Sequence, residues 1–299
     1  MRDHQAATEM KDVDMDVELR HLRAFAAVAR AHSYTAASRS LLITQPALTR
    51  AVQQLEVATG TQLLQRNSRS VELTVAGADF YEKVLAILGD LDRTVQSMRG
   101  EQEFRVGFQW VLPVPWATQA VSEFERATGV ATRLLRRDDV GPHLERGELD
   151  VAVTRTRLKD DDLEHVLLFS EERVAVFAAG SGFALRQGTS WQELARHPLV
   201  INTVNGTTQP ELWPPKDRPQ HLILCENFDE WLHLVATGRG VGALPRSAAR
   251  STQHPDLKFA RLSGAPDVPV WLAFQPRKCS ALVRKFVSIG VAVGAQEGL

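Results

Sequence analysis

The ten residues "LLITQPALTR" (41–50) end one apolar periodicity and start another. An apolar run stops at Thr44, a proline follows at position 46, and apolar spacing resumes at Leu48. Threonine caps helix N-termini by accepting a backbone amide hydrogen bond, and proline fits the first helical turn because its missing N–H is not needed there. The stretch therefore predicts two helices joined by a tight turn, with the second starting directly after Thr44.

The residues on either side of this turn predict three short helices with a shared core. Apolar residues at helical spacing indicate a first helix over about 18–32, and Ser33 is placed to cap a second helix over about 34–42. The third helix ends near Gly60, and its apolar face carries Leu48, Val52 and Leu55. Two helices joined in this way form a helix-turn-helix.

Polar side chains near the start of the third helix are expected on the side opposite its apolar face. Arginine and glutamine bond base edges in bidentate fashion, threonine bonds a base or a phosphate, and the amides of a helix N-terminus favour a phosphate. A plain helical bundle with a solvated polar face is the alternative. The candidate DNA-binding residues of this region are Ser33, Thr35, Thr44, Gln45, Pro46, Thr49, Arg50 and Gln53.

The stretch "LLQRNSRSVELT" (63–74) predicts a short hairpin, or wing, after the third helix. Its turn, Asn67-Ser68, lies between Arg66 and Arg69, and Val71 and Leu73 alternate as in a strand. Both arginines are candidates for contact with phosphate or with the minor groove. Between residues 18 and 74 there are seven arginines and three acids, a formal charge of +4 that leaves −5 for the rest of the chain. The charge distribution favours an anionic partner at this end.

A long helix over about 75–98 follows the wing. Its apolar residues alternate at spacings of three and four, which is typical of a heptad seam and predicts dimerisation. Fewer than three heptads are present, so packing on its own domain is the alternative. The predicted dimerisation residues are Tyr81, Val84, Leu88, Leu91 and Val95.

Length and composition indicate a globular protein of two domains, with room for a small third unit. Of the 299 residues, 44% are hydrophobic and 24% charged. The sequence contains no apolar run of about 18 residues, the length that would predict a membrane span. Its polar first residues lack the apolar core of a signal peptide, so we expect a cytoplasmic location. Residues 1–17 are interpreted as a flexible tail, with translation starting at Met1 or Met15. The distant Cys225 and Cys279 are expected to be buried free thiols, a redox switch being the alternative.

Residues 103–299 alternate strand-like and helix-like segments, which predicts a mostly parallel α/β sheet. Ligands of such sheets bind beyond the carboxyl ends of the strands. Arginines, amides and helix N-termini there suit a small anionic effector, while helix capping and loop hydrogen bonds are the alternative for each residue. The candidate effector-binding residues are Gln109, Trp110, Arg137, Arg155, Asn202, Thr203 and Asn227.

Three motifs resemble catalytic or cofactor sites without completing them. The glycines of 238–242 follow a predicted helix rather than a strand, so a dinucleotide loop is not expected. Glu230 and His233 form a single Glu-x-x-His pair where a di-iron site needs two. Gly180-Ser181-Gly182 lacks the flanking pattern of a nucleophile elbow. We therefore expect no metal, no cofactor and no enzymatic activity.

Taken together, these elements resemble the LysR-type transcriptional regulators. The resemblance rests on "LRHLRAFAAVARAHSYTAASRSLLITQPALTRAVQQLEVATGTQLLQR" (19–66) and "VELTVAG" (71–77). Thr49 stands where the family commonly has serine, and Leu64 where phenylalanine is usual. The C-terminal region is similar more weakly, in "LERGELDVAV" (144–153), "HPLV" (197–200) and "LVATGRGVGALP" (234–245).

The resemblance implies an α+β multidomain architecture: a winged helix-turn-helix (18–74), a linker and dimerisation helix (75–102) and an α/β effector-binding domain (103–299). The last is expected to comprise two subdomains like those of periplasmic binding proteins, one using about 103–167 and 270–299 and the other about 168–268. The expected partners are double-stranded DNA, a small-molecule effector and a second copy in a homodimer or tetramer, with RNA polymerase as a further candidate.

The resemblance implies a sequence-specific transcriptional regulator controlled by that effector. Two alternatives stay open on the sequence. One is a DNA-binding regulator without effector response, and the other is an enzyme whose N-terminal helices only dimerise it.

Overall fold

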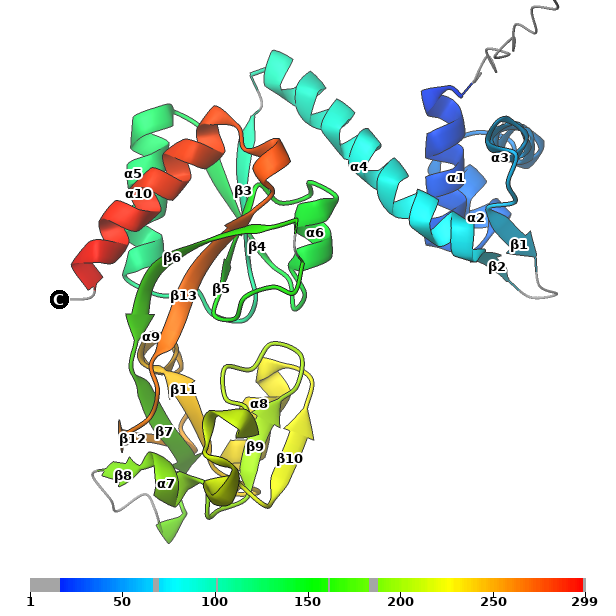
Figure 1. Cartoon of the computed structure of the whole chain (residues 1–299). Coiled ribbons are helices and arrows are strands. Elements are labelled where there is room, and N and C mark those ends of the chain that lie inside the picture. Colours follow the sequence, from blue (N-terminus) through cyan, green and yellow to red (C-terminus); the bar gives the residue numbers. More distant parts are fainter. Residues whose placement is uncertain (1–16, 67–69, 101, 161, 183–187, 298–299) are drawn as a thin grey trace, which may run out of the picture. The chain divides into compact units, whose positions relative to one another are not determined.

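The computed structural model describes residues 17–66, 70–100, 102–160, 162–182 and 188–297 (Figure 1). The chain divides into two compact units, one up to Val95 and the other from Gln96 onward. The predicted tail lies outside the described residues except for Val17, as do the Asn67-Ser68 turn and Arg69. None of the helices in the described segments combines the length and the apolar content needed to cross a lipid bilayer.

The first unit has the predicted order of helices and strands, and local capping explains where its helices start and end. The hydroxyl of Ser33 accepts a hydrogen bond from the amide of Ala36 (3.3 Å), and that of Thr44 accepts one from the amide of Ala47 (3.4 Å). Gly60 ends the third helix with a left-handed φ of 63°. The elements are α1 (Leu19–Ala31), α2 (Tyr34–Ser40), α3 (Gln45–Thr59), β1 (Leu64–Arg66), β2 (Val71–Leu73) and α4 (Val75–Met98).

The core of this unit draws on the long helix α4 as well as on the three short helices. Val84 is completely buried there, and the ring of Tyr81 lies 6.1 Å from that of Phe25. Leu88 is partly buried against the same core. For the first half of this helix the structure therefore favours the alternative to the dimerisation seam, which is packing on its own domain. Tyr81, Val84 and Leu88 contribute to their own domain, because the helix continues directly from the wing and lies over α1.

One subdomain of the second unit is built on a five-stranded sheet with the order β4-β3-β5-β13-β6. β3 is parallel to β4 and β5, but β13 is antiparallel to both β5 and β6, so the sheet is mixed rather than mostly parallel. The helices α5 and α10 lie side by side on one face (Figure 1), where the ring of Phe286 is 5.0 Å from that of Phe104. The elements are β3 (Glu103–Phe108), α5 (Trp116–Thr128), β4 (Ala131–Arg136), α6 (Gly141–Glu145), β5 (Val151–Thr154), β6 (Glu164–Glu171), β13 (Val268–Phe274), the 3-10 helix Pro276–Lys278 and α10 (Ala281–Glu297).

The other subdomain has a four-stranded sheet, β11-β7-β12-β8, and a parallel pair, β9-β10, which an isolated bridge from Leu199 to Val241 connects to the segment before β11. The indoles of Trp191 and Trp213 stack in its core at 3.7 Å. Its elements are β7 (Arg173–Ala178), β8 (Gly188–Ser190), α7 (Trp191–Leu194), β9 (Leu199–Asn202), the 3-10 helices Pro210–Leu212 and Pro215–Asp217, β10 (Leu222–Cys225), α8 (Phe228–Ala236), β11 (Gly242–Pro245), α9 (Arg246–Ser251) and β12 (Leu257–Ser263).

Two crossovers connect the subdomains, and they lie a few residues from the expected positions. β6 pairs with β13 along its whole length, so that Glu171 is opposite Val268. Residues 168–171 and Val268, which the sequence placed in the second subdomain, therefore lie in the sheet of the first. A strand ends where its backbone no longer has hydrogen-bond partners on the neighbouring strand. The pattern of apolar residues in the sequence does not show where that happens.

Candidate functional site

The start of α3 presents a polar face to solvent, as predicted. Leu48, Val52 and Leu55 are completely buried in the core of the unit. On the other side, Gln45, Pro46, Arg50 and Gln53 are exposed, as are Thr35 and Thr44, while Thr49 and Ser33 are half-buried. The structure thus brings the predicted set together around the start of one helix.

Several of these side chains already have structural partners. The hydroxyls of Ser33 and Thr44 cap α2 and α3, so their first role is to fix the turn between the helices. Thr35 donates to the side-chain carbonyl of Gln45 at 3.3 Å, which connects the two helices on the exposed side. Arg50 and Gln53 also line a groove of about 450 Å³. The groove is completed by Glu18, Arg20, His21, Gln54, Val57 and Ala58.

The wing is held in place by residues that the sequence reading did not single out for this role. The carboxylate of Glu56 accepts hydrogen bonds from the amides of Leu63 (2.8 Å) and Leu64 (3.0 Å). On the other strand, the amide of Val71 donates to the carbonyl of His32 at 3.1 Å. Arg66 ends β1, and Arg69 lies outside the described residues. The Leu-Glu pair at 55–56 was a signal that could have identified the anchor.

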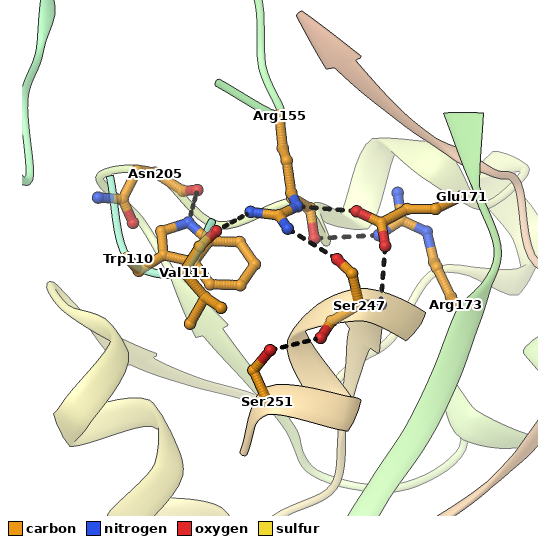
Figure 2. Close-up of polar contacts among 9 residues, drawn as sticks. Trp110, Val111, Arg155, Glu171, Arg173, Asn205, Ser247 and Ser251 are labelled. Carbon is orange, nitrogen blue, oxygen red and sulfur yellow. Dashed lines mark hydrogen bonds and ion pairs between the residues drawn. The ribbon is translucent and has the colours of Figure 1, made fainter. Parts of the chain in front are cut away.

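Arg155 is the centre of a hydrogen-bond network between the two subdomains of the second unit (Figure 2). Its side chain lies just past β5 and is 5% exposed. It donates to the Glu171 carboxylate (3.0 Å), to the carbonyl of Val111 (2.5 Å) and to the hydroxyl of Ser247 (3.0 Å). The amide of Ser247, at the start of α9, donates in turn to Glu171 at 2.8 Å. The network thus joins β5, β6 and α9.

Burial lowers the pKa of the Arg155 guanidinium, and the neighbouring Glu171 carboxylate raises it again in part. Arginine stays protonated in proteins, so the result is a buried, compensated ion pair. Arg155 was predicted to bind an anionic effector. Its charge is instead paired within the chain.

Trp110 makes the second connection between the subdomains. It follows β3 in the first subdomain, and its indole N–H donates to the carbonyl of Asn205 in the second at 3.3 Å. Its ring stacks on Phe228 with centroids 5.0 Å apart, and the guanidinium carbon of Arg155 lies 4.6 Å from its centroid. The side-chain amide of Asn205 donates back to the carbonyl of Asp138 at 2.9 Å. Trp110 is buried, as expected of a residue that lines the cleft.

Four of the predicted effector-binding residues fit the structural alternative. The side chain of Asn202 accepts from the amides of Val204 and Asn205 within a turn. Thr203 donates to the carbonyl of Cys225 at 3.2 Å, and Arg137 to that of Arg136 at 2.8 Å. Asn227 caps α8 by accepting from the amide of Glu230 at 2.9 Å. These contacts hold loops and helix starts.

Gln109 differs from those four, because it is buried and its side-chain oxygen has no hydrogen-bond partner among the described residues. The hydroxyl of Thr154, at the end of β5, is in the same condition. Thr154 was not predicted. Its position directly before Arg155, at a strand's carboxyl end, was the signal available. Buried polar atoms without partners are uncommon and suggest a binding role.

Two cavities lie in this region. A small one of about 20 Å³ is lined by Trp110, Phe228 and Trp231, together with Asn202, Thr207 and Thr208 among others. A larger one of about 400 Å³ lies at the crossovers, lined by Trp116, Phe169, Glu171, Glu172, Arg246, Ser247, Arg250 and Asp267 among others. The cavity beside the predicted residues Trp110 and Asn202 is therefore much smaller than ordinary ligand pockets.

The motifs that resembled cofactor or metal sites have ordinary structural roles. Gly238 follows α8 with φ of 72°, and β11 begins at Gly242, which is a helix end leading into a strand. His233 and Glu230 are exposed on α8. Within the described ranges, no group of three or more His, Cys, Asp and Glu side chains is arranged to hold a metal ion. Cys225 is buried and Cys279 half-buried, both as free thiols.

Comparison with known protein families gives two matches that together span most of the chain. Residues 19–78 match the family described as bacterial regulatory helix-turn-helix protein, lysR family. Residues 99–293 match the family described as the LysR substrate binding domain. The two matched ranges correspond to the winged module with the start of α4, and to the two-subdomain unit.

Similar proteins include named transcriptional regulators. YnfL of Escherichia coli, an uncharacterised HTH-type transcriptional regulator, is 32% identical over 277 residues, covering 87% of this chain and 93% of YnfL. The HTH-type regulator BenM of Acinetobacter baylyi is 32% identical over 313 residues, covering 94% and 98%. The crystal structure of CbnR, a LysR family transcriptional regulator, is similar in fold with a TM-score of 0.74 at 24% identity, covering 93% of this chain and 99% of CbnR. CbnR has also been solved with its target DNA.

Proposed function

This chain belongs to the LysR family of DNA-binding transcriptional regulators with an effector-binding domain, and we propose that a small molecule bound between its two subdomains controls its operator binding. The observation that carries the proposal is the network of Arg155 and Trp110. Both residues follow strands of the first subdomain and bond to Ser247 and Asn205 of the second. A ligand entering there has to alter these contacts. The relatives are named as regulators, so the enzyme alternative is set aside.

The proposed reading head is the exposed side of α3. Arg50, Gln45 and Gln53 are exposed side chains of the types that bond base edges in bidentate fashion. Thr49 contributes a hydroxyl beside them. Arg66 at the end of β1, and Arg69, which the sequence predicts at the turn of the wing, are proposed to bond the phosphate backbone. The amides at the start of α3 favour an anion, which supports a phosphate contact at that end.

A mobility-shift titration of the full chain against its own upstream intergenic DNA tests the DNA part. It is run at two salt concentrations with excess nonspecific competitor, and specific retardation should weaken with salt. Arg50→Ala should cost about 1–3 kcal/mol of operator binding if Arg50 makes a bidentate base contact. Arg126→Ala, an exposed arginine of the other unit, is the matched control. Equal losses in the two variants would remove the reading role from Arg50.

The effector part requires a ligand that binds one arrangement of the subdomains better than another, since only such a ligand shifts the population. A regulator without effector response is the competing proposal. The two differ in whether any small molecule changes operator affinity in the titration described above. A screen of low-molecular-weight metabolites with this assay, in which none changes the affinity, would favour the constitutive regulator.

Dimerisation through the second half of α4 is also proposed, because Leu91 and Val95 lie outside the buried core and Val95 is 41% exposed. Two copies would present two reading heads to two half-sites. Val95→Asp should lower the sedimentation coefficient of the full chain, while Thr94→Asp on the same helix should not. An unchanged dimer or tetramer in the Val95 variant would place the interface elsewhere. Contact with RNA polymerase and a cytoplasmic location remain predictions.

A further inference from the structure

The part of the cleft beside Trp110 is occupied by the chain itself. The remaining space beside Trp110 is about 20 Å³, which is close to the volume one water molecule needs. Ligand pockets for small molecules are typically about 300–1,000 Å³. Trp110 is the residue that reduces the space, since its large ring lies within the cleft and is only 7% exposed.

The contacts of the Trp110 indole are those a bound aromatic ligand would make. Its ring stacks on Phe228, with an interplanar angle of 27°, and Phe228 stacks on Trp231 at 8°. Its N–H reaches a backbone carbonyl, that of Asn205, at 3.3 Å. Arg155 supplies a cation 4.6 Å from the ring centroid. An aromatic surface, an acceptor and a cation for a π-face together form a recognition site for a planar ring with one donor.

The charge of this slot is already balanced. Arg155 lies over the indole, and its Nε is 3.0 Å from the Glu171 carboxylate in a pair whose side chains are 5% and 9% exposed. An anionic ligand would gain little from a cation that is paired, and its carboxylate would face the backbone carbonyl oxygen of the buried Asn205, which is an acceptor and not a donor. A neutral ring meets neither penalty.

Trp110 is also placed where it can leave. It lies in a bend just past the last residue of β3 and outside any strand or helix. Its neighbour Gln109 has a buried side-chain oxygen without a partner among the described residues. A rearrangement of this bend would therefore break one hydrogen bond of Trp110, and it would allow the side-chain oxygen of Gln109 to accept one.

We propose that the indole of Trp110 occupies the effector's place in the ligand-free protein, and that the effector is a neutral planar aromatic compound carrying one ring N–H or O–H donor. On binding, the compound takes the stacking surface of Phe228 and the carbonyl of Asn205, and Trp110 leaves the slot. This proposal rests on the proposed effector function and adds the chemical class of the ligand. It replaces the anionic class suggested by the arginines in the sequence.

The experiment uses indole as the probe and the full-length chain as wild type and as Trp110→Ala. Isothermal titration should give at least tenfold tighter indole binding to the variant, because the competing side chain is gone. Naphthalene, which lacks the N–H, and benzoate, which is anionic, should each bind the variant at least fivefold more weakly than indole does. Equal indole affinity in wild type and variant, or a preference for benzoate, would overturn the proposal.

Two further variants keep the result interpretable. Trp213→Ala removes a buried indole from the core of the second subdomain, and an equal gain in indole affinity there would reduce the effect to a general cavity and overturn the proposal. Trp110→Phe refills the slot without the N–H and should bind indole with intermediate affinity. If the alanine variant does not fold, Trp110→Phe replaces it in the test. Equal indole affinity of Trp110→Phe and wild type would then count against the proposal.

Operator binding provides the link to function. Saturating indole should change the operator affinity of the Trp110→Ala variant at least threefold, and should not change that of Trp213→Ala. Binding in the expected order without any change in operator affinity would overturn the assignment of the slot as the effector site. The operator titration without indole tests the proposed DNA-binding function separately, so the two failures are distinguishable.

Discussion

The carboxylate of Glu56, on the helix α3 that carries the proposed reading face, accepts a hydrogen bond of 2.8 Å from the backbone N–H of Leu63, at the start of the wing. The same oxygen accepts a second one from Leu64 at 3.0 Å. Hydrogen bonds to a charged acceptor are stronger than neutral ones, so this one side chain fixes the position of the wing relative to α3.

Glu56→Ala should therefore destabilise the winged unit by about 1–3 kcal/mol, because two amides lose their acceptor. Glu56→Gln keeps an acceptor oxygen and should lose less. All six tryptophans lie in the other unit, so unfolding of the winged unit is followed by far-UV circular dichroism rather than by tryptophan fluorescence. Equal stability of the alanine variant and the wild type would show that the wing is anchored by other contacts, such as that of His32.

Gly77 is required by a close approach of two backbones. A Cβ on Gly77 would lie 2.0 Å from the carbonyl oxygen of Leu63, an atom of the wing's own backbone that cannot rotate away. Gly77→Ala should therefore cost about 1–3 kcal/mol or more in the free energy of unfolding, as overpacking typically does. Gly180→Ala is the control, since nothing lies within 4 Å of the added atom and its φ is not in the left-handed region. A thermal midpoint as high as that of wild type in Gly77→Ala would contradict the prediction.

The winged unit could be predicted closely because its signals are local. Caps at Ser33 and Thr44 and the stop at Gly60 are read within a few residues, and the structure confirms the start of each helix. The residues of the dimerisation seam were harder to predict, because periodicity identifies an apolar face of a helix without identifying what covers that face. Val84 shows this, being buried by its own unit.

The effector region was harder to predict because its contacts are distant in sequence. Arg155 was identified from its place after a strand, but its pairing with Glu171 depends on where β6 ends. Asn202 and Asn227 have side chains of the type that binds ligands, but Asn202 holds a turn and Asn227 caps α8.

Cys225 is expected to be unreactive. Burial, and to a smaller extent the charge of Glu230, raise the pKa of its thiol from 9.0 to about 11. The thiol therefore stays protonated at pH 8, and the thiolate is the reactive form. Iodoacetamide at pH 8 should label Cys279 well before Cys225, as peptide mass spectrometry would show, and both equally in urea. Faster labelling of Cys225 in the native chain would contradict this.

The same raised pKa predicts a pH dependence of stability. The folded chain favours the neutral thiol, so the contribution of Cys225 is fully present below the unfolded pKa near 9.0 and is lost as the pH rises through about 11. Urea unfolding of the second unit, followed by tryptophan fluorescence, should show a steeper loss between pH 8 and pH 10.5 in wild type than in Cys225→Ala. Parallel losses in the two proteins would assign the pH dependence to other groups.

Two ion pairs of the second unit have similar distances and different burial, and they should differ strongly in energy. Arg155 and Glu171 are 3.0 Å apart with side chains 5% and 9% exposed, whereas Arg136 and Asp229 are 3.2 Å apart at 42% and 74%. Removing one partner of a buried pair leaves an uncompensated charge and costs about 3–5 kcal/mol. An exposed pair contributes about 0–1 kcal/mol and is screened by salt.

Arg155→Met and Glu171→Met should therefore each destabilise the second unit by about 3–5 kcal/mol in fluorescence-monitored urea unfolding, and the double variant by much less than the sum, because no charge is left without a partner. Arg136→Met should change the stability by about 1 kcal/mol or less, and only at low salt. The double variant should also respond more readily to ligands in the operator assay, since the network that holds the two subdomains together is gone. Additive losses in the double variant would mean that the two side chains act independently, and the network would then not serve as the connection on which subdomain movement depends.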